Sequence, residues 1–150
     1  MAHCIQEQIV AWVKTKLAEL VSAGTLIAVE RPVRDGLPSN VRHGLLALYQ
    51  DDPAEIEATH GAAYWNLPLA CLLFAKPADG STTAVDTTLN DLRAHVEKKL
   101  MEDTTCGGLA HLVTIRAPEH FAHARGDWEG VIVNVEIQFG TLESDPFTQV

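Results

Sequence analysis

The chain has 150 residues and a formal net charge of −9, with 47% hydrophobic and 21% charged residues. This size fits one domain with a substantial buried core, and the composition excludes a disordered or collagen-like chain. The excess of acidic residues argues against sequence-independent binding to a phosphate backbone.

The opening segment, MAHCIQEQIVAWVKTKL, is interrupted by Glu7 and Lys14. We therefore expect neither a signal peptide nor a membrane span, and a protein that stays in the cytosol. Cys4, Cys71 and Cys106 are odd in number and contain no CxxC pair. This pattern predicts free thiols rather than a disulfide framework or a structural zinc site.

Apolar residues at three- and four-residue spacings predict an amphipathic helix over residues 5–21. Gly24 follows as a C-terminal cap of this helix. Residues 25–32, TLIAVERP, are predicted to form a short strand that Pro32 ends. Residues 33–40, VRDGLPSN, have the composition of a loop.

The middle of the chain contains one ambiguous segment and one clear strand. The length of residues 44–50, GLLALYQ, favours a strand and their leucine and alanine content favours a helix; we predict a strand. Residues 52–59, DPAEIEAT, fit a helical turn with Pro53 in its first position. Residues 66–77, NLPLACLLFAKP, are apolar on both alternating faces, which predicts a central strand that begins at Pro68 and is covered on both sides.

A second helix and two strands are predicted in the remaining residues. The helix carries one apolar stripe and follows a capping box formed by Thr88 and Asp91. Residues 109–118, LAHLVTIRAP, read as a strand that ends at a proline, and a polar excursion follows. Within residues 130–140 an apolar set alternates with Asn134, Glu136 and Gln138, which predicts the last strand. The apolar set consists of Val131, Val133, Val135, Ile137 and Phe139. The stripe of the helix consists of Leu89, Leu92, Val96 and Leu100.

This order of elements predicts a single α+β domain over residues 1–140, followed by an exposed acidic tail over residues 141–150. We expect a mixed or mainly antiparallel sheet of about four to five strands, with the two main helices packed on one face.

Motifs for common catalytic sites are missing from the sequence, which contains no GxGxxG, GxxxxGK[ST], GxSxG or HExxH. We therefore predict no catalytic residue, no metal and no cofactor. One alternative is a small metal-dependent enzyme, because a helical turn from Pro118 would place His120 and His123 on one face, with Asp127 or His111 as a third ligand. Among seven histidines this spacing arises easily by chance, and a surface loop explains it more simply.

A nucleophilic cysteine is a weaker alternative. Cys106 precedes Gly107 and Gly108, and a distant histidine would have to act as its base. Chain reversal after a helix explains the two glycines without any chemistry.

Several residues are candidates for partner binding. The loop with Arg31, Arg34 and Arg42 holds half of the six arginines, so it is either a solvated loop or a docking loop for an acidic partner or DNA. Such a loop would suit an adaptor domain. Trp65 and Trp128 lie beside glycine-containing segments, where large aromatic side chains either anchor an interface or fold onto the core.

The order of segments resembles that of the tail terminator, or tail-completion, proteins of long-tailed bacteriophages, such as the lambda tail terminator. The resemblance extends over nearly the whole chain and rests on pattern more than on a single motif. It rests on IVAWVKTKLAEL, VERPVRDGLPSN, LLALYQDD, LPLACLLFA, TTLNDLRAHVEKKLMED, the Gly-Gly-Leu at 107–109, and ESDPF.

The resemblance implies a structural α+β subunit that forms a homo-oligomeric ring, a hexamer in that family. Such a ring caps the tail tube and meets the head–tail connector, and DNA passes through it without sequence-specific binding. The protein would be in the host cytoplasm during assembly and then in the virion. The Arg31–Arg42 loop and the C-terminal segment, with Asp145 and Phe147, are the expected partner contacts.

Overall fold

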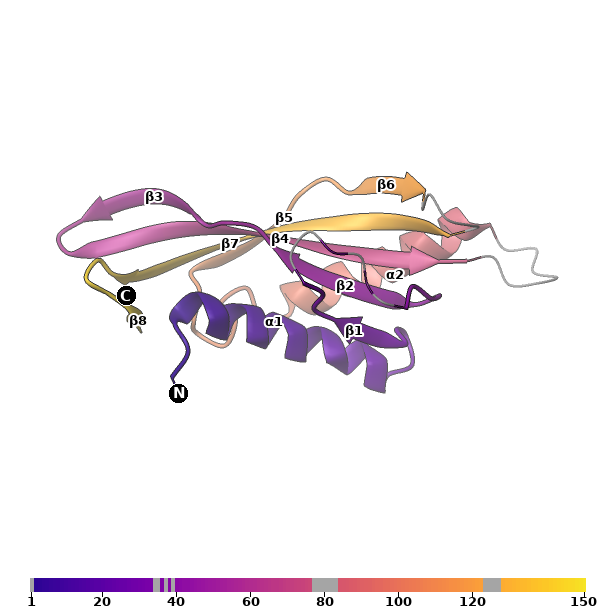
Figure 1. The fold of residues 1–150 in the computed structure, drawn as a ribbon, viewed down its shortest axis with the longest axis horizontal. Coiled ribbons are helices and arrows are strands. Elements are labelled where there is room, and N and C mark those ends of the chain that lie inside the picture. The colour runs from indigo at the N-terminus through magenta and orange to yellow at the C-terminus, as the bar shows by residue number, and fades with distance from the viewer. Residues whose placement is uncertain (1, 34–35, 37, 39, 77–83, 123–127) are drawn as a thin grey trace.

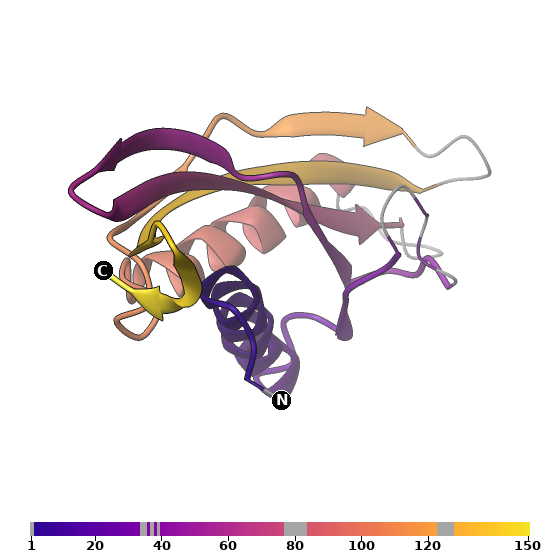
Figure 2. The same ribbon diagram turned by 60° about the vertical axis from the view of Figure 1, so that its left-hand side comes forward.

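The structure is a computed structural model that describes residues 2–33, 36, 38, 40–76, 84–122 and 128–150. It is an elongated α+β domain in which two helices lie on one face of a long, curled, mixed sheet (Figure 1, Figure 2). The elements in chain order are α1 (Ile5–Ser22), β1 (Ala28–Glu30), β2 (Leu45–Gln50), β3 (Ala54–Thr59), β4 (Ala62–Ala75), α2 (Val85–Met101), β5 (Leu112–Ile115), β6 (Glu119–Ala122), β7 (Glu129–Leu142) and β8 (Asp145–Gln149).

The predicted first helix and its cap are confirmed. α1 ends in a Schellman motif, in which the Gly24 N–H donates to the Val21 carbonyl at 3.0 Å and the Thr25 N–H donates to the Leu20 carbonyl at 2.9 Å. Gly24 adopts a φ of 81°, a left-handed conformation that glycine reaches without strain. The chain can therefore turn sharply and begin β1 after a few residues.

The sheet is built around one long antiparallel ladder between β4 and β7, each of 14 residues. On the far side of β4, β2 pairs with its second half and β3 with its first half. On the far side of β7 lie β6, β5 and β8 in succession. β1 runs parallel to β2, and the other pairings among the described residues are antiparallel.

The expected capping box at Thr88 is wrong. The N-cap is Ala84, four residues before Thr88, and α2 begins at Val85 with no side-chain hydrogen bond at the cap. Val85 lies one turn before Leu89 and packs against the same core. The apolar stripe therefore extends to Val85, and its burial stabilises an additional helical turn before Leu89. Thr88 is consequently inside the first turn.

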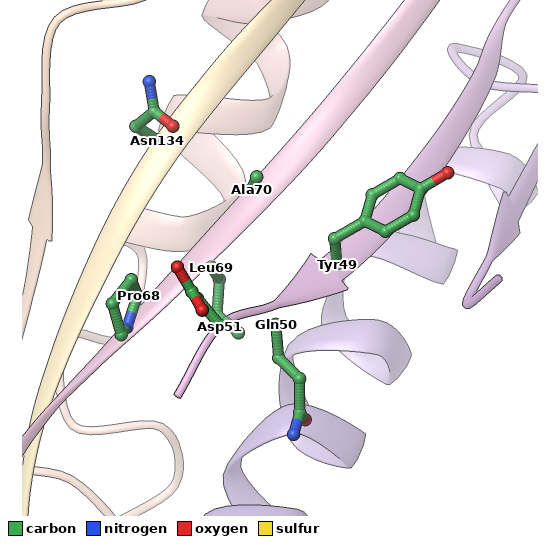
Figure 3. Close-up of a pocket in the computed structure, with 7 residues that line it drawn as sticks. All are labelled: Tyr49, Gln50, Asp51, Pro68, Leu69, Ala70 and Asn134. Atoms are coloured by element: carbon green, nitrogen blue, oxygen red, sulfur yellow. The ribbon is translucent and has the colours of Figure 1, made fainter. Parts of the chain in front are cut away.

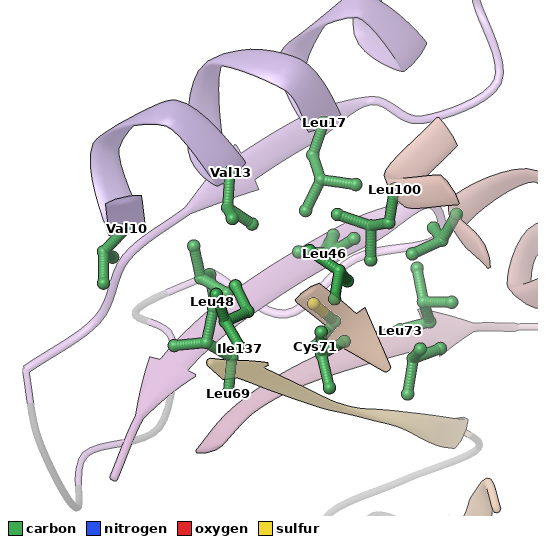
Figure 4. Close-up of a cluster of buried hydrophobic side chains, with 14 of the residues drawn as sticks. Val10, Val13, Leu17, Leu46, Leu48, Leu69, Cys71, Leu73, Leu100 and Ile137 are labelled. Carbon is green, nitrogen blue, oxygen red and sulfur yellow. The ribbon is translucent and has the colours of Figure 1, made fainter. Parts of the chain in front are cut away.

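The main core lies between the two helices and the sheet. Figure 4 shows Val13 and Leu17 of α1 and Leu100 of α2 directed toward side chains of the sheet strands. The predicted alternation of the last strand is confirmed, because Val131, Val133, Val135, Ile137 and Phe139 are all buried in this core.

β4 is the predicted central strand, and we expected other elements to cover both of its faces along the whole length. The face of β4 that points away from the helices is covered at one end only. There a small second cluster contains Leu45, Ala47 and Phe74, with Phe121 of β6 packed against it. The Phe74 and Phe121 rings meet edge to face, with centroids 5.5 Å apart. Along the rest of that face the β4 side chains are half-buried.

Pro68 lies in the middle of β4 and not at its start, which corrects the predicted boundary. Its carbonyl accepts a hydrogen bond from the Asp51 N–H at 3.0 Å, so its backbone polar groups face away from β7. β3 pairs with β4 up to Asn66 and β2 begins to pair at Leu69, which leaves Pro68 at the gap between the two strands. No ladder hydrogen bond therefore needs the N–H that proline lacks.

The described residues form a sheet of eight strands, where about four to five were expected, because β3, β6 and β8 were not predicted. The predicted helical turn at residues 52–59 is β3, folded back on β4 by a two-residue turn. His60 and Gly61 in that turn have φ values of 51° and 79°, as a type I′ turn requires. The polar excursion after Pro118 contains β6, which continues along the same edge of β7 as β5.

The C-terminal segment, expected as an exposed tail, folds back along β7. Leu142 is in register with Asp145, and the Val150 N–H donates to the Gly140 carbonyl at 3.1 Å. The side chains of residues 146–150 are exposed. Within the described part of the chain, neither helix is long and apolar enough to cross a membrane.

Candidate functional site

The histidines of the metal-site alternative are not brought together by the structure. His120 lies in β6, opposite Val131, so the backbone is extended where a helical turn was considered. The N–H of His111 donates to the Gln138 carbonyl, seven residues further along β7, which places His111 roughly 23 Å from His120 at the usual strand rise. His123 and Asp127 lie outside the described residues. Among those that are described, no three His, Cys, Asp or Glu side chains form a cluster able to hold a metal.

Cys106 is not placed as a nucleophile. Its side chain is fully buried, and burial together with the nearby Asp103 carboxylate raises the pKa of its thiol to about 12. Burial also raises the pKa of the Cys71 thiol to about 12. Because the thiolate is the reactive form, both sulfurs are inert near neutral pH.

We expect one thiol per folded chain to react with Ellman's reagent at pH 8, and three after unfolding in urea. Cys4 is the half-buried cysteine of the three, whereas Cys71 and Cys106 are buried. The Cys4→Ser variant should lose the fast reaction of the folded protein and keep two thiols after unfolding. Labelling of Cys106 in the folded chain at the rate of Cys4 would contradict this assignment.

The described arginines of the predicted docking loop are engaged within the domain. The Arg31 guanidinium donates to both carboxylate oxygens of Glu7, at 2.6 and 2.9 Å, and to Gln50 Oε1 at 2.8 Å. Arg42 donates to Glu30 Oε1 at 3.2 Å and to the Asn40 carbonyl at 2.7 Å. These contacts attach the loop to α1, β1 and β2. Arg34 lies outside the described residues.

The pair of Arg31 and Glu7 makes a small, pH-dependent contribution to stability. The hydrogen bonds and the positive charge of the Arg31 guanidinium hold the pKa of the Glu7 carboxyl below its ordinary value. A lowered folded-state pKa means that the stabilisation is present at neutral pH and is lost as the pH falls through that pKa. Both side chains are about one-third exposed, so solvent screening keeps the contribution to about 0–1 kcal/mol.

The two candidate tryptophans lie at different places on the sheet. Trp65 is half-buried, packs against the main core, and pairs across the ladder with Phe139. Trp128 precedes β7 and is half-buried, with the Lys76 ammonium 5.6 Å from its ring centre. Trp12 of α1, which sequence reasoning did not single out, is also half-buried and lies against Gly107.

Asp145 and Phe147 lie together in β8. The Asp145 carboxylate accepts hydrogen bonds from the Thr148 hydroxyl at 2.6 Å and from the Phe147 N–H at 3.0 Å, and these bonds lower the pKa of its carboxyl. The Phe147 side chain is 54% exposed. Asp145 therefore shapes the turn into β8, while Phe147 presents an apolar ring to solvent.

A pocket of about 340 Å³ lies beside the gap between β2 and β3 (Figure 3). Its polar side chains have structural partners, because the Tyr49 hydroxyl donates to the Gly36 carbonyl at 2.7 Å and the Asn134 amide donates to the Ala117 carbonyl at 3.4 Å. Among the described residues of the wall there is no cysteine, serine, histidine or lysine, and the one ionisable carboxylate is that of Asp51. The residues that line it are Tyr49, Gln50, Asp51, Pro68, Leu69, Ala70 and Asn134.

One end of the sheet projects as a hairpin arm, which we define as β3 with residues 62–66 of β4 (Figure 1). β3 is exposed along almost its whole length and pairs only with β4 among the described strands. Ile56 is 54% exposed and lies between Glu55 and Glu57, for which the structure shows no ion pair within the described part of the chain. The arm thus presents one apolar side chain between two acidic ones.

A shallow, open groove of about 560 Å³ lies between α2 and β5, and we call it the α2–β5 groove. Its wall on the helix includes Met101, which is 47% exposed, and Lys98, which is exposed and has no ion pair among the described residues. Sequence reasoning missed this groove because Met101 and Lys98 lie outside the buried stripe of α2. The lining residues are Ala94, Glu97, Lys98, Met101, Val113, Thr114 and Ile115.

These features define a single-domain α+β protein. No family model matches the chain. No curated protein matches it either. Among solved structures it is similar to a chain of the virion of a native gene transfer agent particle, with 14% identity, a TM-score of 0.47 and coverage of 90% of each chain. A likeness of this size is too small to transfer a function.

Proposed function

We propose that the protein is a structural assembly protein of a phage-like tail. It forms a homo-oligomeric ring that caps the tail tube and joins the tube to the head–tail connector. The observation that carries the proposal is the presence of two unlike, solvent-exposed surfaces on one domain: the acidic hairpin arm and the α2–β5 groove. Two different complementary surfaces make heterologous contacts, and such contacts generate closed rings when the rotation between copies closes.

The order of segments in the sequence supports the same role, since it resembles that of tail terminator proteins. We expect six copies in the ring, as the resemblance implies, in the host cytoplasm during assembly and in the tail of the virion afterwards. The net charge of −9 suits a ring through which DNA passes without being held.

The test uses tail-tube subunits that polymerise in vitro, with the protein added at increasing ratios. We expect electron micrographs to show a ring at one end of each tube and the mean tube length to fall as the ratio rises, because a capped end no longer adds subunits. The Lys14→Ala variant is a matched control, since Lys14 is exposed on α1 and lies in neither surface. Tubes of unchanged length without a terminal ring would contradict the proposal.

A further inference from the structure

The hairpin arm and the α2–β5 groove are complementary in charge and in polarity. Ile56 on the arm lies between Glu55 and Glu57, two carboxylates without ion pairs among the described residues. In the groove the exposed Met101 lies one helical turn from Lys98, a cation that is likewise without an ion pair in the described part of the chain.

The other charges at the groove are already neutralised. Glu97 accepts from Arg93 at 3.2 Å, and Arg116, which follows β5, donates to Glu136 at 2.7 Å. Lys98 is therefore the charge of the groove that is left to attract a carboxylate. The positive charge of Lys98 would attract the carboxylates of an acidic arm, and the bound arm would cover apolar side chains of the groove.

We propose that the occupant of the α2–β5 groove is the hairpin arm of a second copy of this chain, with Ile56 against Met101 and Glu57 beside Lys98. This inference rests on the proposed function, because it supplies the contact that repeats around the ring. The alternative contact of the arm with β8 of the next copy is disfavoured, since Glu143 and Asp145 would bring like charges together.

The geometry of the arm favours side-chain docking over the addition of one strand edge to another. The register of β3 on β4 shifts between Glu55 and Glu57, and both such interruptions of a ladder and charges on an edge strand oppose edge-to-edge pairing. An exposed apolar side chain on such a strand, like that of Ile56, can enter a groove without a continuous ladder of backbone hydrogen bonds. The contact therefore needs Ile56 and the two flanking charges more than it needs the free backbone groups of β3.

The first test is a disulfide between two singly substituted proteins in a Cys4→Ser background. A mixture of Ile56→Cys and Met101→Cys proteins should form mixed disulfide dimers at least about ten times faster than a mixture of Ile56→Cys and Asn90→Cys. Asn90 is exposed on the same helix but lies roughly 16 Å away from Met101 along its axis, which is beyond the reach of a disulfide. Equal rates for the two mixtures would overturn the inference, as would faster pairing of Ile56→Cys with itself.

A charge exchange provides the second test. Glu57→Lys and Lys98→Glu should each weaken self-association about fivefold or more in sedimentation, while the double variant should recover it, because Glu57 of one copy faces Lys98 of the next. Circular dichroism checks that each variant is folded. A double variant no better than either single variant would overturn the inference, and so would a wild-type chain that is monomeric at all concentrations.

The outcomes separate this contact from the proposed function. If the chain caps tail tubes but the cross-link and the charge exchange fail, the contact is wrong and the proposed function stands. If the cross-link forms and tubes are neither capped nor shortened, the contact stands and the function is wrong.

Discussion

Replacement of Leu48 by alanine is expected to lower the free energy of unfolding by about 2–5 kcal/mol. Leu48 is fully buried in β2, in register with Cys71 of β4, and Figure 4 shows it on the side of the sheet that faces α1. The lost methyl groups leave a cavity between a helix and a sheet, and the closely packed surroundings can relax into it only in part.

Urea unfolding followed by circular dichroism measures this change, provided that the dependence of the free energy on urea is the same in both proteins. Thr15→Ala is the matched control, because Thr15 is exposed on α1 and its loss should change the free energy of unfolding by less than about 0.5 kcal/mol. If Leu48→Ala were as stable as this control, Leu48 would not lie in the shared core.

The second large effect is expected at Gly130, at the start of β7. Gly130 is in register with Phe74 of β4 on one side and with Phe121 of β6 on the other. A Cβ atom at this position would overlap the Phe121 ring and would lie 2.7 Å from the Leu73 carbonyl oxygen. Gly130→Ala should therefore lower the free energy of unfolding by about 1–3 kcal/mol, as overpacking does elsewhere.

A double variant separates the two clashes. Phe121→Ala removes the ring but leaves the Leu73 carbonyl. The double variant Gly130→Ala, Phe121→Ala should therefore lose less free energy of unfolding than the sum of the losses in the two single variants. Thermal or urea unfolding of the four proteins gives the coupling free energy. Simple additivity would mean that the Phe121 ring does not lie over Gly130.

The candidate site was only partly predictable. Both arginines that the structure describes in the loop have partners inside the domain, and the sequence could not reveal these because Glu7 lies 24 residues before Arg31. The hairpin arm was missed because Pro53 and the glutamates of AEIEAT suit a helical turn as well as an edge strand. The glycine at position 61, in the pair His60-Gly61 between two possible strands, is the sequence signal that could have identified the turn. The α2–β5 groove could not be predicted from Met101, because a single methionine at the end of a helix is common and does not indicate a binding surface.

The sequence by itself determined the two helices and the presence of strands at the positions of β4 and β7, but not the pairing of these two strands. Their apolar residues recur with the period of a helix or a strand over many positions, and this periodicity is a local property of the chain. Only the tertiary structure decided where β3, β6 and β8 lie, that Pro68 is in the middle of a strand, and that α2 and β5 leave a groove between them. The physical reason is that a short strand is held by hydrogen bonds to a partner strand, and the neighbouring backbone rather than its own sequence supplies these bonds.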